Sequence, residues 1–192
     1  MPEPSLGLLA RVVLIVALLA LGLVVARRFF FAFPAQRPAD YAETAPPFDL
    51  RQALNGPLVA SGVIYGPAGR VATRFVADMQ GTWDGSGGTL AEDFRYDGGS
   101  TQTRAWRIAP GSEGRFTATA DDVVGVGEGE VSGATATLRY RLRLPEQAGE
   151  WQVDVTDWLY RGEDGVIVNR AQFRRFGFLV GELVGTIRPA GE

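Results

Sequence analysis

The sequence predicts an all-β domain, a single antiparallel meander that closes into a barrel of about 8–10 strands, preceded by one N-terminal transmembrane helix. Three observations support this prediction. Apolar and polar residues alternate from Leu58 onward, Gly-rich turn signals interrupt the alternation about every 8–14 residues, and one long apolar run precedes the whole pattern. Closure removes unpaired sheet edges, and a two-sheet β-sandwich is the alternative arrangement of the same strands.

The apolar run covers 21 residues, from Leu6 to Ala26, and only Arg11 interrupts it. At the helical rise it measures about 31 Å, which is close to the thickness of one hydrocarbon core. A cleaved secretory signal is the main rival, but its apolar region is normally shorter, and Arg27 and Arg28 follow this run at once. We therefore expect residues 1–33 to form an uncleaved transmembrane anchor.

The charges beside the run leave its orientation open. Arg27, Arg28 and Arg37 follow the run, whereas Arg11 alone lies towards its start. The positive-inside rule would then place the domain in the cytoplasm. Export with a short N-terminal tail inside is the alternative.

Composition excludes several classes of function. All 19 basic residues are Arg, and the chain contains neither Cys nor His. Imidazole and thiolate metal sites, His bases, Cys nucleophiles and Schiff-base lysines are therefore excluded, and we expect no metal and no cofactor. The part beyond Pro38 has 15 Arg against 21 acidic residues, a net charge of −6, so we expect no nucleic-acid partner.

Prolines and turn signals divide the rest of the chain. Residues 34–47 contain four prolines and are predicted as a linker, and residues 48–192 as the barrel domain, beginning with a short helix at 48–55. In the clearest strand, 134–144, Ala, Leu and Tyr alternate with Thr and Arg, so the two sets face opposite sides. Strands are expected at 58–65, 70–83, 88–96, 101–109, 114–121, 124–131, 134–144, 150–160, 165–175 and 178–188.

Charged residues on apolar strand faces are candidates for a ligand site. Glu92 shares its predicted face with Phe94, and Arg104 shares its own with Trp106. An unpaired buried charge is costly, so one interpretation is a Glu92–Arg104 pair inside the barrel that touches any ligand there. The alternatives are a wet face, or a register error of one residue that would turn every side chain to the other face.

Aromatic residues near strand ends supply further candidates. Trp83 belongs to a Gly-x-Trp pattern that recurs in calycin barrels, where the Trp plugs one end and an Arg stacks on it. A Trp packed at a hairpin is the simpler alternative. Trp158 and Tyr160 share a predicted face with Asp154 and Thr156, and this face suits either the wall of an amphipathic pocket or an exposed aromatic patch. Asp157 in the same strand and Arg170 in the next are further candidates.

Several motifs, in order along the chain, resemble those of the domain-of-unknown-function family 3833. They are NGP at 55–57, TWDG at 82–85, EDF at 92–94 with Tyr96, ADDVVG at 120–125, DW-x-Y at 157–160, DG-x-x-x-NR at 164–170 and Phe176-Gly177. The resemblance covers Phe48 to Arg188. It implies a small bacterial envelope protein, usually a lipoprotein, whose genes are often associated with those of fatty-acid-modifying enzymes.

The anchor departs from the family pattern. Relatives typically begin with a signal that ends in a lipidated Cys, and this chain has no Cys. The resemblance therefore implies that the apolar run replaces the acyl anchor in the inner membrane, with a periplasmic domain. The arginines beside the run keep the cytoplasmic orientation as the alternative.

Three functions are compatible with these residues. The favoured one is a membrane-tethered, lipocalin-like barrel that binds a lipid or another apolar small molecule. The second is an enzyme on lipid-like substrates, with Glu92, Asp121, Asp122 or Asp157 as acid or base and Arg104 or Arg170 as anion clamp. The absence of His and Cys argues against it, and Asp121 and Asp122 suit a turn better than a catalytic pair. The third is a structural or partner-binding envelope protein without a ligand.

Overall fold

The chain divides into two compact units, Met1–Arg37 and Pro38–Glu192. The computed structural model describes residues 6–30, 32–145, 149 and 151–191. In the first unit, α1 (Leu6–Phe30) is followed by a 3₁₀ turn, η1 (Phe33–Ala35). A stretch of 21 residues in α1 has a mean hydropathy of 2.9, so this helix is long and apolar enough to cross a membrane, a property that signal sequences share.

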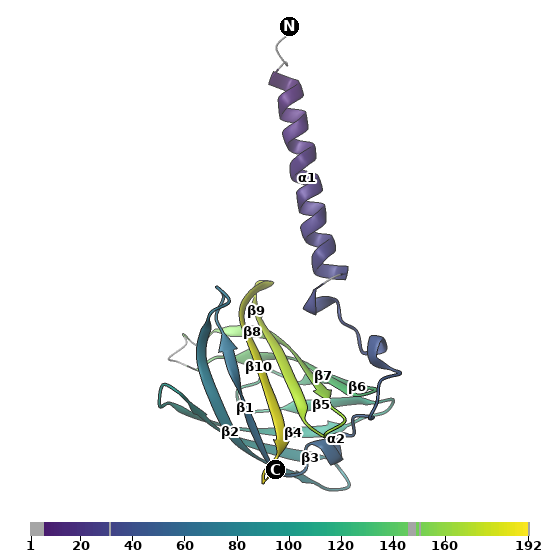
Figure 1. Cartoon of the computed structure of the whole chain (residues 1–192), viewed down its shortest axis with the longest axis vertical. Helices are drawn as coiled ribbons and strands as arrows, with labels where there is room; N and C mark the ends of the chain where they lie inside the picture. Colours follow the sequence, from purple (N-terminus) through teal and green to yellow (C-terminus); the bar gives the residue numbers. More distant parts are fainter. Residues whose placement is uncertain (1–5, 31, 146–148, 150, 192) are drawn as a thin grey trace. The chain divides into compact units, whose positions relative to one another are not determined.

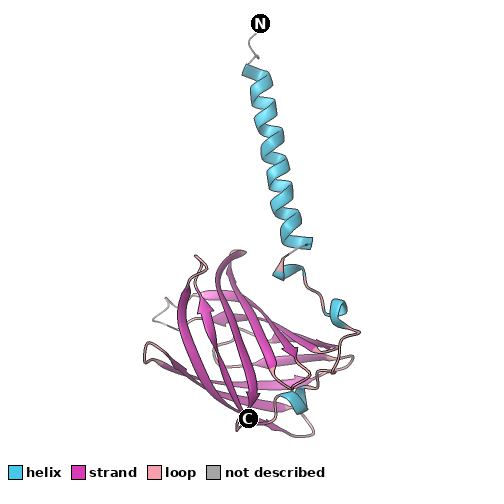
Figure 2. Cartoon of the chain, in the orientation of Figure 1, coloured by secondary structure: helices cyan, strands magenta, loops and turns pink. Residues whose placement is uncertain are grey.

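The second unit is a closed antiparallel barrel to which the described residues contribute ten strands (Figures 1 and 2). Each strand pairs with its successor along the chain, and the last pairs with the first. The predicted meander barrel is confirmed, and the sandwich is wrong because the sheet closes on itself. The strands are β1 (Gly56–Tyr65), β2 (Val71–Trp83), β3 (Gly88–Tyr96), β4 (Thr101–Pro110), β5 (Arg115–Thr119), β6 (Gly127–Ser132), β7 (Thr135–Arg143), β8 (Gln152–Arg161), β9 (Ile167–Arg175) and β10 (Phe178–Pro189).

A short helix, α2 (Leu50–Ala53), covers the barrel end at which β1 begins and β10 ends (Figure 1). Asp49 caps α2, because its carboxylate accepts hydrogen bonds from the first backbone N–H groups. Leu54 follows α2 and is buried in the barrel core, and the Trp83 indole N–H donates to its carbonyl at 2.9 Å. A Cβ at Gly81 would lie 1.9 Å from the same carbonyl oxygen, so this closed end requires glycine there.

Part of the predicted linker, residues 38–47, lies against the outer face of the barrel. A second 3₁₀ turn, η2 (Pro38–Tyr41), contacts β6 and β7. The Tyr41 ring lies 5.3 Å from that of Trp158, and the Thr44 hydroxyl accepts a hydrogen bond from the backbone N–H of Ala134 at 2.9 Å. This segment therefore buries aromatic surface that would otherwise face water.

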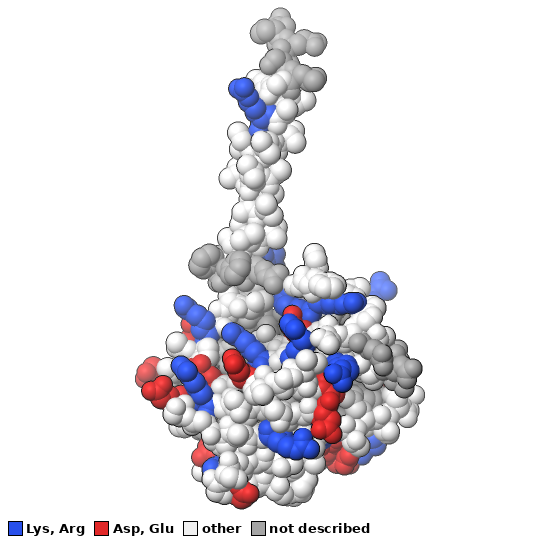
Figure 3. Space-filling view, turned by 180° about the vertical axis from the view of Figure 1, so that it is seen from behind, with Lys and Arg blue, Asp and Glu red and all other residues white. Residues whose placement is uncertain are grey.

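The exposed charges of the barrel pair across neighbouring strands. Arg95 contacts Asp78 at 2.6 Å, and Arg141 contacts Asp154 at 3.0 Å. Figure 3 shows basic and acidic side chains interspersed over one face of the barrel. Exposed pairs of this kind contribute about 0–1 kcal/mol each, so closure and core packing carry more of the stability.

Candidate functional site

The barrel contains a cavity of about 710 Å³. Large apolar side chains line its closed end, among them Leu54, Met79, Leu90, Ile108 and Phe116, and the lining continues to the loops at the other end. Ligand pockets in proteins measure about 300–1,000 Å³ and are mostly apolar with a few polar groups. The interior is thus large enough for a small molecule and chemically suited to an apolar one.

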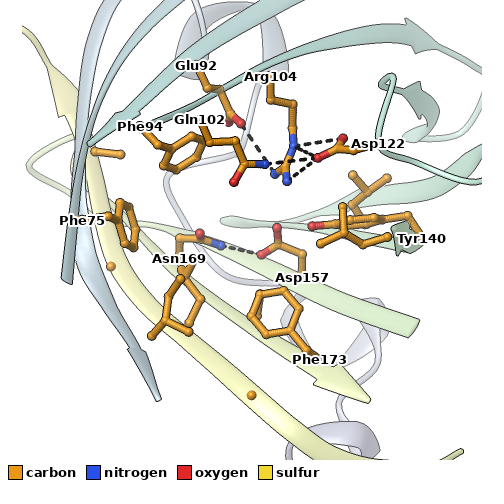
Figure 4. Close-up of a pocket in the computed structure, with 18 of the residues that line it drawn as sticks. Phe75, Glu92, Phe94, Gln102, Arg104, Asp122, Tyr140, Asp157, Asn169 and Phe173 are labelled. Carbon is orange, nitrogen blue, oxygen red and sulfur yellow. Dashed lines mark hydrogen bonds and ion pairs between the residues drawn. The ribbon is translucent and has the colours of Figure 1, made fainter. Parts of the chain in front are cut away.

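One wall of the cavity carries an ion-paired cluster centred on Arg104 (Figure 4). Strand register places Glu92 on β3 directly opposite Arg104 on β4, with 3.8 Å between Oε2 and Nη1. Asp122, in the turn after β5, accepts from Arg104 Nε at 2.9 Å and from Nη2 at 2.8 Å. The guanidinium carbon lies 5.6 Å from the Trp106 ring centre and 6.0 Å from that of Phe94. The predicted Glu92–Arg104 pair is present, and Asp122 completes it.

A second polar pair faces the same cavity from strands β8 and β9. Asn169 donates from its amide to the Asp157 carboxylate, and also to the backbone carbonyl of Trp158 at 3.2 Å. Figure 4 shows Asp157 and Tyr140 pointing into the space that Arg104 faces. The Tyr140 ring packs edge-on against Trp106, with 5.1 Å between ring centres. Two polar groups from separate walls therefore meet in one otherwise apolar interior.

Burial perturbs the carboxyl groups of this interior. It raises the pKa of Glu92 to about 7, against the opposing effect of the Arg104 charge. It also raises the pKa of Asp157 to about 7, although the Asn169 hydrogen bond and Arg104 favour the ionised form. Burial raises the pKa of Tyr140 as well, so its hydroxyl stays neutral. Near neutral pH both carboxyls are therefore poised between the charged and uncharged forms.

Five of the predicted site residues line the cavity, and four do not. Glu92, Phe94, Arg104, Trp106 and Asp157 line it. Trp83, Trp158, Tyr160 and Arg170 are absent from the lining. Glu92 and Phe94 on β3, and Arg104 and Trp106 on β4, lie on the faces that their alternation predicts. Asp157 lies on the face of β8 opposite to the predicted pocket wall.

Of the four other residues, Trp83 packs at a barrel end, as either sequence interpretation allows, whereas Trp158, Tyr160 and Arg170 lie outside the barrel interior. Trp83 packs at the closed end, where its ring lies over Gly88. Trp158 faces outward but has no exposed surface, because the Tyr41 ring covers it and the Tyr160 ring stacks on it at 5.9 Å. Arg170, its cross-strand neighbour, faces outward too and pairs with a glutamate of β10. The face of Trp158 and Tyr160 is therefore not the pocket wall, and Asp157 lines the cavity because its side chain points to the opposite face of β8.

Tyr140 and Asn169 were missed as lining residues, and Asp122, named above as a candidate acid or base, was not predicted to contact Arg104. Tyr140 lies on the correctly predicted inner face of β7, but alternation alone gives an inward tyrosine no particular role. Asn169 is recognisable only as a partner of Asp157 once β8 and β9 are paired. Asp122 reaches Arg104 from a turn, and local sequence does not show how far a turn side chain extends into a barrel.

The comparisons with known proteins agree with this architecture. A family profile described as "Protein of unknown function (DUF3833)" matches residues 28–188. The chain belongs to this family. The resemblance seen in the sequence motifs is thereby confirmed.

Solved structures supply a fold comparison for this DUF3833 member. The S-type phycobiliprotein lyase CPES from Guillardia theta is similar with a TM-score of 0.53 at 8% identity, over 73% of this chain and 90% of the lyase. At that identity the likeness shows the lipocalin-like barrel fold alone. No curated protein matches the chain in sequence.

Proposed function

We propose that this DUF3833 barrel binds a lipid or another apolar amphiphile in its central cavity, and that α1 tethers it to the inner membrane with the barrel in the periplasm. The observation that carries the proposal is the 710 Å³ interior, apolar at its closed end and polar on two facing walls. At roughly 30 Å³ per non-hydrogen atom, the share of one water in the liquid, it accommodates on the order of 20 such atoms. That matches a single medium-length chain with a small head.

An exposed apolar rim at the open end supports uptake from a membrane. Phe176, in the turn between β9 and β10, and Phe178, the first residue of β10, are 85% and 77% exposed, and Trp151, just before β8, is 49% exposed. Phe176 also has a φ of 50°, a conformation that costs a bulky residue roughly 1–2 kcal/mol. Arg175 lies over both neighbouring rings, 4.1 Å from Trp151 and 5.1 Å from Phe176.

Aromatic and arginine side chains together are typical of residues that sit at a membrane–water interface. Val180 follows this turn on β10 and lines the cavity, so the rim continues into the interior. In our proposal, a ligand passes between the bilayer and the barrel across this rim. A chain held at the membrane by α1 meets such ligands at high effective concentration.

Displacement of a fluorescent acyl probe from the full chain, held in amphipol, tests the proposal. With roughly 0.3 kcal/mol per ligand atom over on the order of 20 atoms, we expect a Kd in the tens of micromolar or tighter. Leu183→Trp adds a ring to the cavity wall of β10 and should abolish binding. Val184→Trp adds the same ring on the other face of that strand and should not. Equal binding by both variants would place the probe outside the cavity.

A second candidate is acid–base catalysis on a lipid-like substrate. The observation that favours it is that Glu92 and Asp157 face one cavity, each with a pKa near 7, as a general acid and base would require. Incubation of the chain with membrane lipids, followed by mass analysis, distinguishes the two. Turnover that Glu92→Gln and Asp157→Asn each abolish supports catalysis, whereas saturable binding without any product supports the binding function. The third hypothesis expects a filled core, and the cavity argues against it.

A further inference from the structure

Arg104 is already neutralised inside the barrel. Its Nε and Nη2 atoms both donate to Asp122, and its Nη1 lies 3.8 Å from Glu92. An anionic ligand head would therefore have to displace a carboxylate that already has a two-pronged, charge-assisted contact. The other arginine in the lining, Arg143, is exposed at the far end of β7, beside the loops.

Three neutral side chains of the two walls already donate hydrogen bonds within the protein, whereas the Tyr140 hydroxyl, in the same space, donates none to a described residue. The Tyr96 hydroxyl donates to the Gln102 carbonyl oxygen at 3.0 Å, and the Gln102 amide donates to Asp122 at 3.4 Å. The Asn169 amide is committed to Asp157 and to a backbone carbonyl. A ligand head that only accepts hydrogen bonds therefore finds these groups occupied.

Acceptors, in contrast, are in surplus. Glu92 is 8% exposed and lines the cavity, and its Oε2 accepts no hydrogen bond from any described residue. Asp157 and Asp122 face the same space, so three carboxyl groups share one buried guanidinium. A buried acceptor without a donor costs roughly 1–3 kcal/mol, and a ligand that supplies the donor recovers that energy.

We infer that the cavity selects amphiphiles whose buried head donates hydrogen bonds and carries no negative charge, such as fatty alcohols, amides or amines, over free fatty acids. This inference rests on the proposed function and adds the chemistry of the head. A fatty acid that left its carboxylate at Arg143 would cover Glu92 and Asp157 with its hydrocarbon chain and leave Glu92 Oε2 without a donor.

Competition among three probes of equal chain length tests the inference: dodecylamine, dodecanol and dodecanoic acid. Each displaces an uncharged pyrene-alkane from the full chain in amphipol at about pH 8, where both buried carboxyls are mostly ionised. We expect the amine and the alcohol to displace the probe at concentrations at least about tenfold lower than the acid. The alcohol controls for non-specific attraction of the amine to an acidic protein.

Charge removal in the cavity should reverse the preference. Glu92→Gln with Asp157→Asn should weaken the amine about tenfold and strengthen the acid, while leaving the alcohol within a few-fold. Glu163→Gln removes an exposed carboxylate from the β8–β9 turn and should change none of the three. If the double variant does not fold, the order in which the three probes displace pyrene-alkane from the natural chain still tests the inference.

The outcomes separate the inference from the proposed function. An acid that competes as well as the alcohol, or better, overturns the inference and leaves cavity binding intact. A pyrene-alkane that does not bind the natural chain at all overturns both. If Arg143→Gln abolished binding of the acid, the carboxylate head would lie at Arg143, beside the loops, and this result would also overturn the inference.

Discussion

Substitution of Glu92 by Gln should stabilise the barrel at neutral and alkaline pH. The glutamine keeps the shape of the side chain and its hydrogen-bonding capacity but removes a charge that is 8% exposed and lies 3.8 Å from Arg104. Asp122 remains as the closer partner of the guanidinium, at 2.8 Å. The substitution therefore removes a desolvated charge without leaving Arg104 unpaired.

The magnitude follows from the pKa of Glu92, which rises from 4.5 to about 7 on folding because of burial. Between these two pH values the folded chain holds more protons than the unfolded chain, so the free energy of unfolding falls as pH rises. The loss is complete above pH 7 and amounts to about 3 kcal/mol. Below pH 4.5 Glu92 is protonated in both states, and the natural chain and the variant should be equally stable.

Urea unfolding of the full chain from about pH 4 to about pH 8, followed by Trp fluorescence, measures the effect. In Glu92→Gln the free energy of unfolding should fall less steeply with pH and should exceed that of the natural chain by about 3 kcal/mol at about pH 8. In Glu163→Gln it should equal that of the natural chain at every pH. The stability of Glu92→Gln should still fall somewhat as pH rises, because folding also raises the pKa of Asp157. Parallel profiles for Glu92→Gln and the natural chain, or a variant that is less stable at pH 8, would show that the buried Glu92 charge does not destabilise the folded barrel.

Other substitutions test the outer packing, the closed end and the rim. Trp158→Ala should lower the free energy of unfolding by about 3–5 kcal/mol in urea titrations, because the side chain has no exposed surface; no loss would contradict its role in packing. Gly81→Ala should displace Leu54 and increase hydrogen exchange of the backbone amides around Leu54, because the added Cβ would lie 1.9 Å from the Leu54 carbonyl oxygen. Unchanged exchange would show that the closed end accommodates the methyl group without losing its packing. Phe176→Ser with Phe178→Ser should slow lipid transfer from vesicles to the barrel several-fold at unchanged affinity, and an unchanged rate would exclude the rim from the transfer path.

The ten strands and the inward faces of β3, β4 and β7 were predictable because the information is local. A period of two decides which side chains face the core, and Gly-rich turns decide where strands end. β7 shows this most clearly, since Leu138, Tyr140 and Leu142 line the cavity as the alternation predicts. The Glu92–Arg104 pair was predictable for the same reason, because adjacent antiparallel strands bring the two residues opposite each other.

What local pattern could not supply is the contact between distant segments. Trp158 is an aromatic residue of the kind that often lines a ligand pocket. In the structure Tyr41 covers it instead, and Tyr41 belongs to a Pro-rich segment that the sequence predicts to be a linker. Asp122 reads as a turn, and only closure of the barrel brings it within 2.8 Å of Arg104. Asn169 similarly depends on the pairing of β9 with β8.

Native mass spectrometry of the full chain, extracted from membranes and kept in amphipol, shows directly whether the barrel carries a ligand. We expect a complex with one apolar amphiphile that has no negatively charged head. The bound mass should disappear in Leu183→Trp, which fills the cavity, and persist in Val184→Trp, which does not. A spectrum of ligand-free chain alone, or equal occupancy in the two variants, would contradict a ligand-binding barrel.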